Sequence, residues 1–329
     1  MKKGFLIGLL IVILLLTGCS AWENAYEQAG SSSFKVVSIK GSSALSLIKA
    51  MEPEIKPIVR LGDTVQYTFE EDEDVLYNRL LEGEFDIAIV PTEMAAKLYN
   101  DGSGYQLAAV NTGGYLYLLA NDNTTTNFSN LLGKTVKVVG KGSTSDVVLR
   151  YLLLQNGIDS SKDLTLDYTS SAEELEQEAM NGKVDLMVLS EPWVSELLSK
   201  NSSFNIYLDI QDEWSRVNGT VTPLPQTCLI VKKEIVSQKT ETWKLFLKDY
   251  MDSIIWINSN QDKTAELLDN HEVGIPKESA KKVISRSNLE YLDALSAKSA
   301  VDKYLNIFLE LSPESIGGKL PGTDFYIEK

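Results

Sequence analysis

The sequence predicts an α/β fold made of two similar lobes, and three observations lead to this prediction. First, short apolar runs alternate with helical patterns from Phe34 onward, as they do where strands and helices follow one another in α/β proteins. Second, this alternation repeats about 100 residues further along the chain. Third, 43% of the 329 residues are hydrophobic, which suits a globular protein with a substantial core.

The first half of the folded chain contains three strand and helix pairs. Short runs of β-branched and aromatic residues indicate the strands, and apolar residues three or four apart indicate the helices. The strands are expected at residues 34–39, 65–69 and 85–90. The helices are expected at residues 43–51, 74–81 and 92–99. Because each strand is followed directly by a helix, the pattern favours largely parallel sheets.

The second half repeats this order and echoes two local motifs. Strands are expected at residues 136–139, 164–168 and 184–189, and helices at 144–155, 172–180 and 191–198. A Gly-Ser turn opens the first helix of each half, at Gly41 and Gly142, 101 residues apart. A Gly-x-x-Asp motif precedes the third strand of each half, at Gly83 and Gly182, 99 residues apart. Two echoes in the same order favour two similar lobes over a chance likeness between α/β units.

The remaining chain is mainly helical, and its apolar positions are typical of a core. Helices are expected around residues 243–255, 280–285 and 297–309, and residues 313–329 are expected to run over the surface. In the first of these helices, apolar spacings of three, four and seven predict one buried face. Its members are Trp243, Phe246, Leu247, Tyr250, Met251, Ile254 and Ile255. Cys228, in a buried strand expected at 226–231, is expected to be a structural thiol.

The start of the chain is typical of an export signal. Lys2 and Lys3 precede a run of 13 apolar or small residues at 4–16. A helix that spans a membrane needs about 20 such residues, so this run has the length of a signal-peptide core instead. We therefore expect the chain to be exported.

The signal ends in Leu16-Thr17-Gly18-Cys19, which resembles the bacterial lipoprotein box. In proteins with this box, the cysteine is acylated and becomes the first residue of the mature chain. The resemblance implies a signal peptide at 1–18, a lipid anchor at Cys19 and a flexible linker over the rest of 19–33. It places the protein on the outer face of the cell membrane. An ordinary secretory signal with an incidental cysteine is the alternative.

The composition and the motifs argue against several classes of function. The formal net charge is −15, from 31 basic and 46 acidic side chains, which disfavours nucleic acid and a polybasic membrane contact. His271, expected at the surface, is the only histidine, so no metal site is expected. No Gly-x-Ser-x-Gly elbow stands at a strand–helix turn, and no phosphate-binding loop with Gly-Lys-Ser/Thr occurs. We expect no catalytic residue and no cofactor.

Polar residues follow the predicted strands at the positions where ligands bind in α/β sheets. These positions lie beyond the carboxyl ends of strands, where helix starts present unpaired backbone N–H groups. The candidates from the two Gly-Ser turns are Gly41, Ser42, Ser43, Gly142, Ser143 and Thr144. The candidates after the echoed third strands are Pro91, Thr92, Glu93, Glu191 and Trp193. Helix capping alone is the alternative for the turns, because Ser and Thr are preferred N-caps.

These candidates point to different kinds of ligand contact. The glycines allow a close approach of the backbone, and the hydroxyls add hydrogen-bond donors. Glu93 and Glu191 are expected to accept hydrogen bonds from an amine or an aminopyrimidine, unless they merely favour positive helix ends. Trp193 is expected to stack on a flat ligand, with packing at a helix start as the alternative. No arginine falls in these loops, so a bidentate clamp on an oxyanion is not visible.

Five stretches of the sequence carry a family resemblance. They are residues 86–96 (DIAIVPTEMAA), 133–136 (GKTV), 140–144 (GKGST), 191–193 (EPW) and 316–326. They resemble solute-binding proteins of ABC importers, in the branch that includes nitrate, sulfonate, taurine and thiamine-pyrimidine binders. The resemblance runs from about Lys35 to Tyr326. It implies a two-lobed, type II periplasmic-binding-protein-like fold, with the ligand cleft between the lobes.

The resemblance also implies how the chain is divided between the lobes. Lobe one is expected to combine residues 34–112 with 224–329, and lobe two to hold residues 113–223. Two crossover segments are expected, at 111–115 and 221–225, where glycine or proline interrupts the pattern. Asn111 and Tyr115 at the first crossover are further candidates for ligand contact. Two segments that cross a hinge permit the lobes to close around a ligand.

The function implied by the resemblance is solute capture for import. The protein would act as a monomer and deliver a small polar or heteroaromatic solute to an ABC permease with its ATPase. The solute stays open between a sulfonate, nitrate or taurine-like anion and an aminopyrimidine-like molecule. A binding-only sensor is one alternative. An enzyme is the other, because menaquinone- and pyrimidine-pathway enzymes share a fold of this kind and a cleft carboxylate could act as acid or base.

Overall fold

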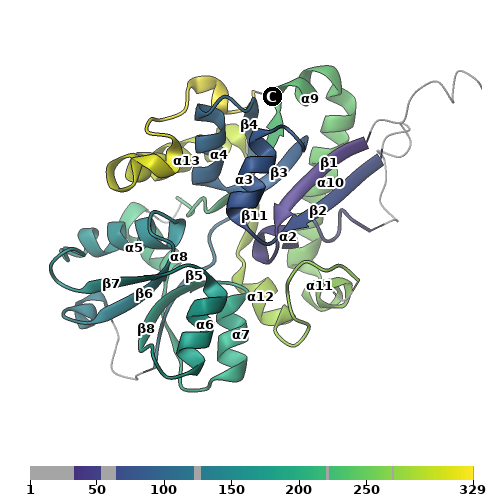
Figure 1. Cartoon of the computed structure of the whole chain (residues 1–329). Coiled ribbons are helices and arrows are strands. Elements are labelled where there is room, and N and C mark those ends of the chain that lie inside the picture. The colour runs from purple at the N-terminus through teal and green to yellow at the C-terminus, as the bar shows by residue number, and fades with distance from the viewer. Residues whose placement is uncertain (1–32, 53–63, 122–126, 220–221, 269, 329) are drawn as a thin grey trace, which may run out of the picture.

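The computed structural model describes residues 33–52, 64–121, 127–219, 222–268 and 270–328. They form two β-sheets, one above the other in Figure 1, with helices packed on both. The expected signal peptide, Cys19 and all but the last residue of the linker lie outside these residues. Within them, no helix combines the length and the hydrophobicity needed to cross a membrane.

The upper sheet in Figure 1 has six strands in the order β11–β4–β10–β3–β1–β2. They are β1 (Ser33–Ile39), β2 (Thr64–Glu70), β3 (Ile87–Pro91), β4 (Tyr105–Thr112), β10 (Thr227–Lys232) and β11 (Leu289–Asp293). β1 pairs in parallel with β2 and β3, whereas β10 pairs antiparallel with β3 and β4. The three strands expected in the first half therefore form the parallel part of this sheet.

The lower sheet has five strands in the order β7–β6–β8–β5–β9. They are β5 (Leu116–Ala120), β6 (Thr135–Val139), β7 (Thr165–Thr169), β8 (Leu186–Ser190) and β9 (Asn205–Asp209). β6 pairs in parallel with β7 and β8, and β5 pairs antiparallel with β8 and β9. β5 and β10 are each the first strand after the chain passes between the sheets. Both run antiparallel to their neighbours, as β11 does to β4, so the expectation of largely parallel sheets is wrong.

Helices cover both sheets. The upper lobe carries α3 (Glu73–Leu81), α4 (Thr92–Asn100), α9 (Lys233–Gln238), α10 (Thr240–Ser259), α11 (Gln261–Leu268), α12 (Ala280–Arg286) and α13 (Ala294–Leu311), besides the short α2 (Ser42–Leu45). The lower lobe carries α5 (Thr144–Gln155), α6 (Ala172–Met180), α7 (Trp193–Lys200) and α8 (Ile210–Asn218). The predictions for α5 and α6 match residue for residue. The hydroxyls of Ser143 and Ser171 fix their starts by accepting backbone N–H groups.

The helix expected at 43–51 is wrong in its length, because α2 ends at Leu45 and turns follow it. Ser253 of α10 explains the early end. Its hydroxyl donates to the carbonyl of Ser46 at 2.8 Å and accepts the N–H of Ala50 at 3.2 Å. A continuing helix would join these two groups directly, since its bonds link residues four apart. The Ser253 hydroxyl of α10 therefore takes the place of one backbone hydrogen bond of the expected helix.

The long helix α10 buries one face, as its periodicity predicts. Trp243, Phe246, Tyr250 and Ile254 are buried in the upper lobe. Ile255 departs from the expectation, because its side chain is 55% exposed. Ile257 is the buried residue in that turn instead. The buried face of α10 therefore follows the 3.6-residue period of a helix, and Ile255 lies just outside that face.

Cys228 and His271, both singled out in the sequence, are at least partly buried. Cys228 is fully buried in β10 and has no disulfide partner. Burial raises the pKa of its thiol to about 12, which makes it inert at neutral pH and confirms the structural role. His271 is half-buried rather than free at the surface, and its Nε2 lies 2.9 Å from Oε1 of Glu52.

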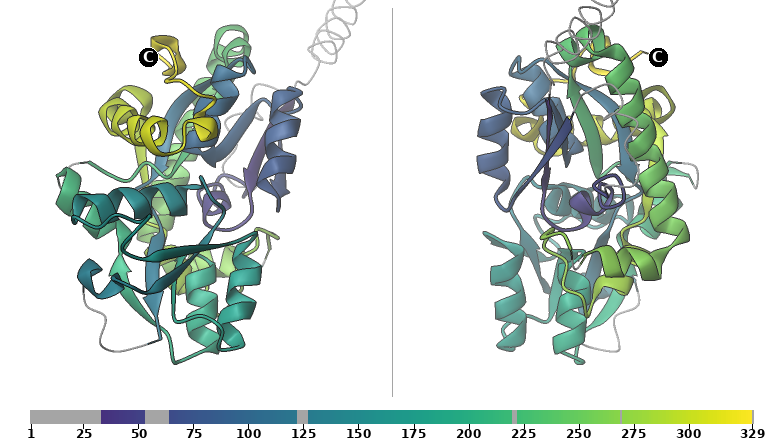
Figure 2. Two further views of the ribbon diagram at one scale, coloured as in Figure 1. Left: turned by 60° about the vertical axis from the view of Figure 1, so that its left-hand side comes forward. Right: turned by 90° about the vertical axis from the view of Figure 1, so that its right-hand side faces the viewer.

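The two lobes pack directly on one side of the crossings. Residues 113–115 lead from β4 to β5, and the chain returns between α8 and β10. Helix α13 of the upper lobe lies against α5 of the lower lobe (Figures 1 and 2). The rings of Trp214 in α8 and Tyr304 in α13 contact each other with centroids 6.2 Å apart. One continuous hydrophobic cluster therefore joins the lobes behind the helix starts.

Candidate ligand site between the two lobes

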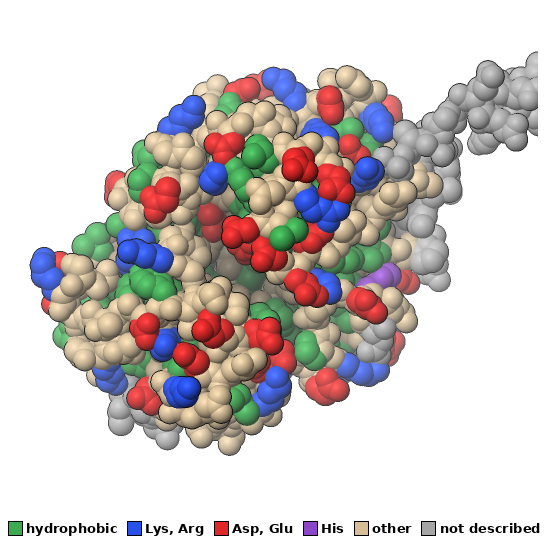
Figure 3. Space-filling view, in the orientation of Figure 1, with side chains coloured by type: hydrophobic (Ala, Val, Ile, Leu, Met, Phe, Trp, Pro, Cys, Tyr) green, Lys and Arg blue, Asp and Glu red, His purple; other side chains and the backbone are tan. Residues whose placement is uncertain are grey.

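Helix starts from both sheets meet where the lobes face each other. Helices α2, α3 and α4 follow the parallel strands of the upper sheet, and α5 and α7 follow two strands of the lower sheet. A Cβ added to Gly41, just before α2, would lie 3.0 Å from Cδ of Pro192, just before α7. Figure 3 shows a hollow between the lobes with acidic side chains gathered at its upper edge. This is the position where ligands bind in sheets of this kind.

Glu93 joins the lobes through the hydroxyl group of Thr144. Thr144 of the lower lobe donates a hydrogen bond to Oε1 of Glu93, and Tyr304 of α13 donates to Oε2 at 2.9 Å. The two hydroxyls also lie 3.0 Å from each other. All three residues are buried. Burial raises the pKa of Glu93 above its ordinary value, and both hydrogen bonds act in the opposite direction.

Tyr115 links the first crossing to the upper lobe. Its hydroxyl lies 3.1 Å from Oγ of Ser43, and its backbone N–H donates to Oε1 of Gln226 in the second crossing. Asn111 is fully buried behind it, where its Oδ1 accepts a hydrogen bond from Thr227 at 2.8 Å. The structure therefore brings Ser43 and Tyr115 together, while Asn111 uses its side chain to hold the upper sheet.

Glu191 is buried at the start of α7 and is held by its own helix. The backbone N–H and the hydroxyl of Ser195 donate to its two oxygens at 3.1 and 2.8 Å. Nη1 of Arg286, from the upper lobe, lies 3.6 Å from Oε1 of Glu191 and donates to the Ser195 hydroxyl. Burial raises the pKa of Glu191, and Ser195 and Arg286 oppose that shift. No local pattern marks Arg286, because it is the last residue of α12 and lies far along the chain from Glu191.

The polar groups of the turn at 142–144 already form hydrogen bonds within the protein. Oδ2 of the buried Asp146 accepts the N–H of Gly142 at 2.8 Å. The Ser143 hydroxyl caps α5, as the capping alternative predicted. Gly142 has a φ of +83°, and a Cβ there would lie 2.8 Å from Oγ of Ser312 in the upper lobe. Only glycine suits this contact between the lobes.

The remaining polar candidates of the upper lobe hold neighbouring segments. The hydroxyl of Ser42 accepts from Ser287 at 3.1 Å. The hydroxyl of Thr92 donates to the carbonyl of Pro225 at 2.6 Å. Pro91 ends β3 and caps α4 without a side-chain hydrogen bond. These residues lie at the predicted helix starts, and their contacts place the second crossing against the upper lobe.

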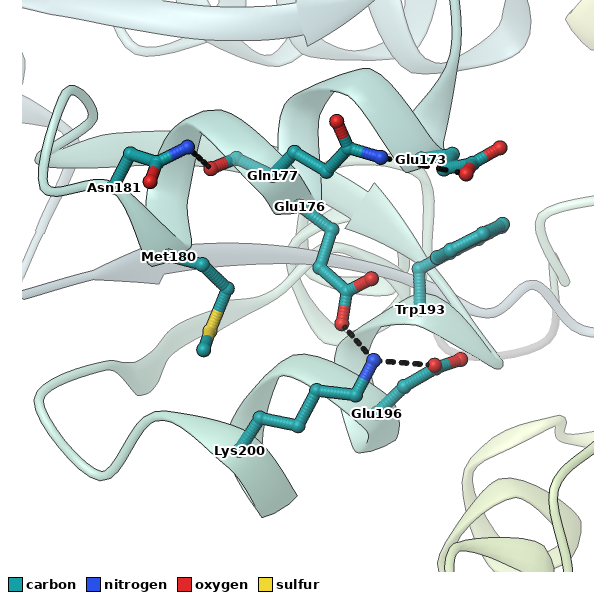
Figure 4. Close-up of a pocket in the computed structure, with 8 residues that line it drawn as sticks. All are labelled: Glu173, Glu176, Gln177, Met180, Asn181, Trp193, Glu196 and Lys200. Atoms are coloured by element: carbon teal, nitrogen blue, oxygen red, sulfur yellow. Dashed lines mark hydrogen bonds and ion pairs between the residues drawn. The ribbon is translucent and has the colours of Figure 1, made fainter.

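Trp193 lines a different hollow. Figure 4 shows its ring in a groove between α6 and α7 on the lower lobe. This groove has a volume of about 490 Å³ and is lined also by Glu173, Glu176, Gln177, Met180, Asn181, Glu196 and Lys200. Lys200 bridges two of these carboxylates, at 2.9 Å from Glu176 and 2.6 Å from Glu196. The stacking role of Trp193 stays a prediction, and the structure places its ring among these side chains.

Glu73 is a candidate that the sequence analysis missed. It is the first residue of α3, its side chain is exposed, and no described residue forms a hydrogen bond or ion pair with its carboxylate. Burial raises the pKa of Tyr115, and the charges of Glu73 and Glu93 add to that shift. Glu73 therefore lies at the same edge of the upper sheet as the starts of α2 and α4, because all three helices follow neighbouring parallel strands.

The acidic side chains of the described residues do not form a metal site. Among them, no three histidine, cysteine, aspartate or glutamate side chains are grouped so that they could hold a metal ion. The groups that converge on the hollow are carboxylates and hydroxyls. Such groups bind donors, so the arrangement suits a small molecule with N–H or O–H groups.

Solved structures of transport proteins share this fold. An ABC transporter from Parabacteroides distasonis is 28% identical, with a TM-score of 0.76 over 91% of this chain and 100% of that one. The alkanesulfonate-binding protein SsuA from Xanthomonas axonopodis pv. citri, bound to MOPS, is 13% identical, with a TM-score of 0.70 over 91% and 99%. The nitrate-binding protein NrtA from Synechocystis PCC 6803 is 16% identical, with a TM-score of 0.63 over 87% and 84%.

These comparisons confirm the two-lobed periplasmic-binding-protein-like α/β fold that the family resemblance implied. None of the curated proteins compared with the chain matches it. A model of the NMT1-like family matches residues 31–269, which is more than half of the 329 residues. The chain belongs to the NMT1-like family.

Proposed function

We propose that the protein is the extracytoplasmic solute-binding component of an ABC importer. The observation that carries this proposal is the contact between helix starts of the two lobes, where Thr144 of α5 donates a hydrogen bond to Glu93 of α4. The likeness to an ABC transporter protein over 91% of the chain supports it. The named relatives that bind alkanesulfonate and nitrate support the same general role.

In this proposal the solute is held by both lobes at once. Lobe one combines residues 34–112 and 224–329, lobe two holds 113–223, and the crossings between them act as the hinge. A solute that contacts both lobes stabilises the closed arrangement over an open one, because only the closed arrangement offers all of its contacts. Tyr115 lies at the first crossing, where it contacts Ser43 and Gln226. The closed protein then delivers the solute to a permease, whose partner ATPase supplies the energy.

The solute-binding role predicts a gain of stability with the right compound. Each compound in a panel of sulfonates, nitrate, taurine, amino acids, polyamines and aminopyrimidines would be added at rising concentration, and thermal unfolding recorded. A solute at 100 times its dissociation constant is expected to add about 2.7 kcal/mol to the free energy of unfolding. A protein that unfolds cooperatively and that no compound stabilises would contradict solute capture and favour the sensor or enzyme alternative.

The same proposal includes a lipid anchor at Cys19, which lies outside the described residues. It rests on the sequence Leu16-Thr17-Gly18-Cys19 and on the short apolar run before it. Two or more acyl chains hold a protein stably on a membrane, whereas one does not. The variant Cys19→Ser is expected to lose the anchor and to appear unprocessed or in the soluble fraction. Normal cleavage and continued membrane attachment of this variant would contradict the anchor.

A further inference from the structure

The two lobes touch each other on two sides, and on one side the contact is mainly apolar. Helix α13 of the upper lobe packs against α5 of the lower lobe, at the left in Figure 1. Tyr304 and Leu305 of α13 and Leu149 of α5 are buried in the same hydrophobic cluster. The ring of Trp214 in α8 adds to this contact, with its centroid 6.2 Å from that of Tyr304. We call the contact of α13 with α5 and α8 the apolar seam.

On the other side, at the right in Figure 1, polar groups join α12 of the upper lobe to α7 of the lower lobe. Arg286 is the last residue of α12, and its side chain is 28% exposed. Its Nη1 donates to the hydroxyl of Ser195 at 3.1 Å and lies 3.6 Å from Oε1 of Glu191. Among the described residues, the hydrophobic clusters on this side each stay within one lobe. The side chain of Arg286 is therefore the main polar link between α12 and α7.

The two contacts differ in what it costs to open them. Opening the apolar seam would expose buried hydrophobic side chains to water, at a cost that grows with the apolar area. Releasing Arg286 exchanges its contacts with Ser195 and Glu191 for hydrogen bonds with water, and this exchange costs little for a partly exposed charge. The α12–α7 side therefore separates more readily than the apolar seam.

From this difference we infer that the lobes open by swinging about the apolar seam, and that Arg286 is the latch that holds the other side closed. The inference rests on the proposed function and adds the direction of opening and the residue that controls it. Gly113 and Gly114 follow β4 directly at the first crossing, where two glycines in succession allow the backbone to rotate. The movement uncovers the starts of α2 and α7, where a Cβ on Gly41 would lie 3.0 Å from Cδ of Pro192.

Double electron–electron resonance between spin labels on the two lobes tests this inference, and it needs no solute. One pair of labels crosses the latch side, on cysteines that replace Lys282 of α12 and Ser199 of α7. The other pair crosses the apolar seam, on cysteines that replace Gln155 of α5 and Lys303 of α13. All four positions are exposed, so the labels leave the core intact. The distances within each pair show which side of the protein opens.

The measurement uses the full chain in a mild detergent, with Cys19→Ser to remove the other reactive thiol. Cys228 is buried and does not take up the label. Arg286→Ala removes the latch from the upper lobe, and Glu191→Gln weakens it from the lower lobe. Arg216→Ala is the matched control, because Arg216 is 55% exposed and pairs with Glu213 of its own helix at 2.8 Å. Thermal unfolding of each variant confirms that it is folded.

The inference predicts that Arg286→Ala raises the ratio of open to closed molecules on the latch side by about tenfold, the usual effect of losing a charged hydrogen bond. Glu191→Gln should raise this ratio as well, and the distances across the apolar seam should stay unchanged in both variants. Arg216→Ala should leave both pairs of labels as in the parent chain. Latch-side distances that change in neither variant would overturn the latch. Lengthening across the apolar seam would overturn the swing. Neither result bears on solute capture, which the stabilisation by added compounds tests separately.

Discussion

Replacing Asp146 with alanine is expected to lower the free energy of unfolding by about 3–5 kcal/mol, the range for breaking a buried ion pair. The Asp146 carboxylate is fully buried and accepts hydrogen bonds from Gly142, Tyr168 and Arg150. Without it, the Arg150 guanidinium, which is 19% exposed, loses its counter-charge. The N–H of Gly142 and the hydroxyl of Tyr168 lose their acceptor at the same time, and each buried unpaired group adds to the cost.

Urea denaturation followed by tryptophan fluorescence measures this loss. Asp167→Ala is the matched control, because Asp167 pairs with Lys137 at 2.8 Å but is 47% exposed. Exposed pairs contribute about 0.2–1 kcal/mol, so this variant should stay close to the wild type. A loss for Asp146→Ala no larger than that of the control would show that Asp146 does not organise the start of α5.

The protein without a solute is expected to lose stability as the pH rises toward 8. Burial raises the pKa of Glu93 and of Glu191, and both side chains are buried. Because the pKa of each carboxyl is higher in the folded protein than in the unfolded chain, folding favours the protonated form.

The contribution of each carboxyl to stability is complete below its unfolded pKa and is lost as the pH rises through its folded pKa. Melting temperatures between pH 4 and 8 measure this trend. In Glu93→Gln and in Glu191→Gln the loss with rising pH should be smaller, and an unchanged slope in both variants would contradict the assignment.

Much of the fold follows from local sequence patterns. α5 and α6 begin after a capping serine and carry regular apolar spacing, so their boundaries agree with the structure. β5 is different, because all five of its residues are buried and no alternation marks it as a strand. β9 and β11 are short and only partly buried over most of their length, so their patterns are weak as well. The early end of α2 depends on Ser253, about 200 residues away.

The site was only partly predictable, because local patterns locate some of its residues and long-range contacts bring in the others. The Gly-Ser turns and the strand ends locate Ser43, Glu93 and Thr144, because each follows directly from a strand–helix order. Arg286 meets Glu191 and Ser195 from a distant part of the chain, at the end of α12, and no local motif encodes that contact. Glu73 stands at the start of a predicted helix, but only the three-dimensional structure shows that its carboxylate has no partner.

Hydrogen–deuterium exchange with and without a solute that stabilises the protein tests the central claim, which is that the solute is held between the lobes. The account predicts slower exchange in both lobes, at the starts of α3 and α4 in the upper lobe and of α5 and α7 in the lower lobe. Residues far from the cleft, such as the end of α10, should exchange as before. Protection confined to one lobe, or to the groove between α6 and α7, would contradict capture between the lobes.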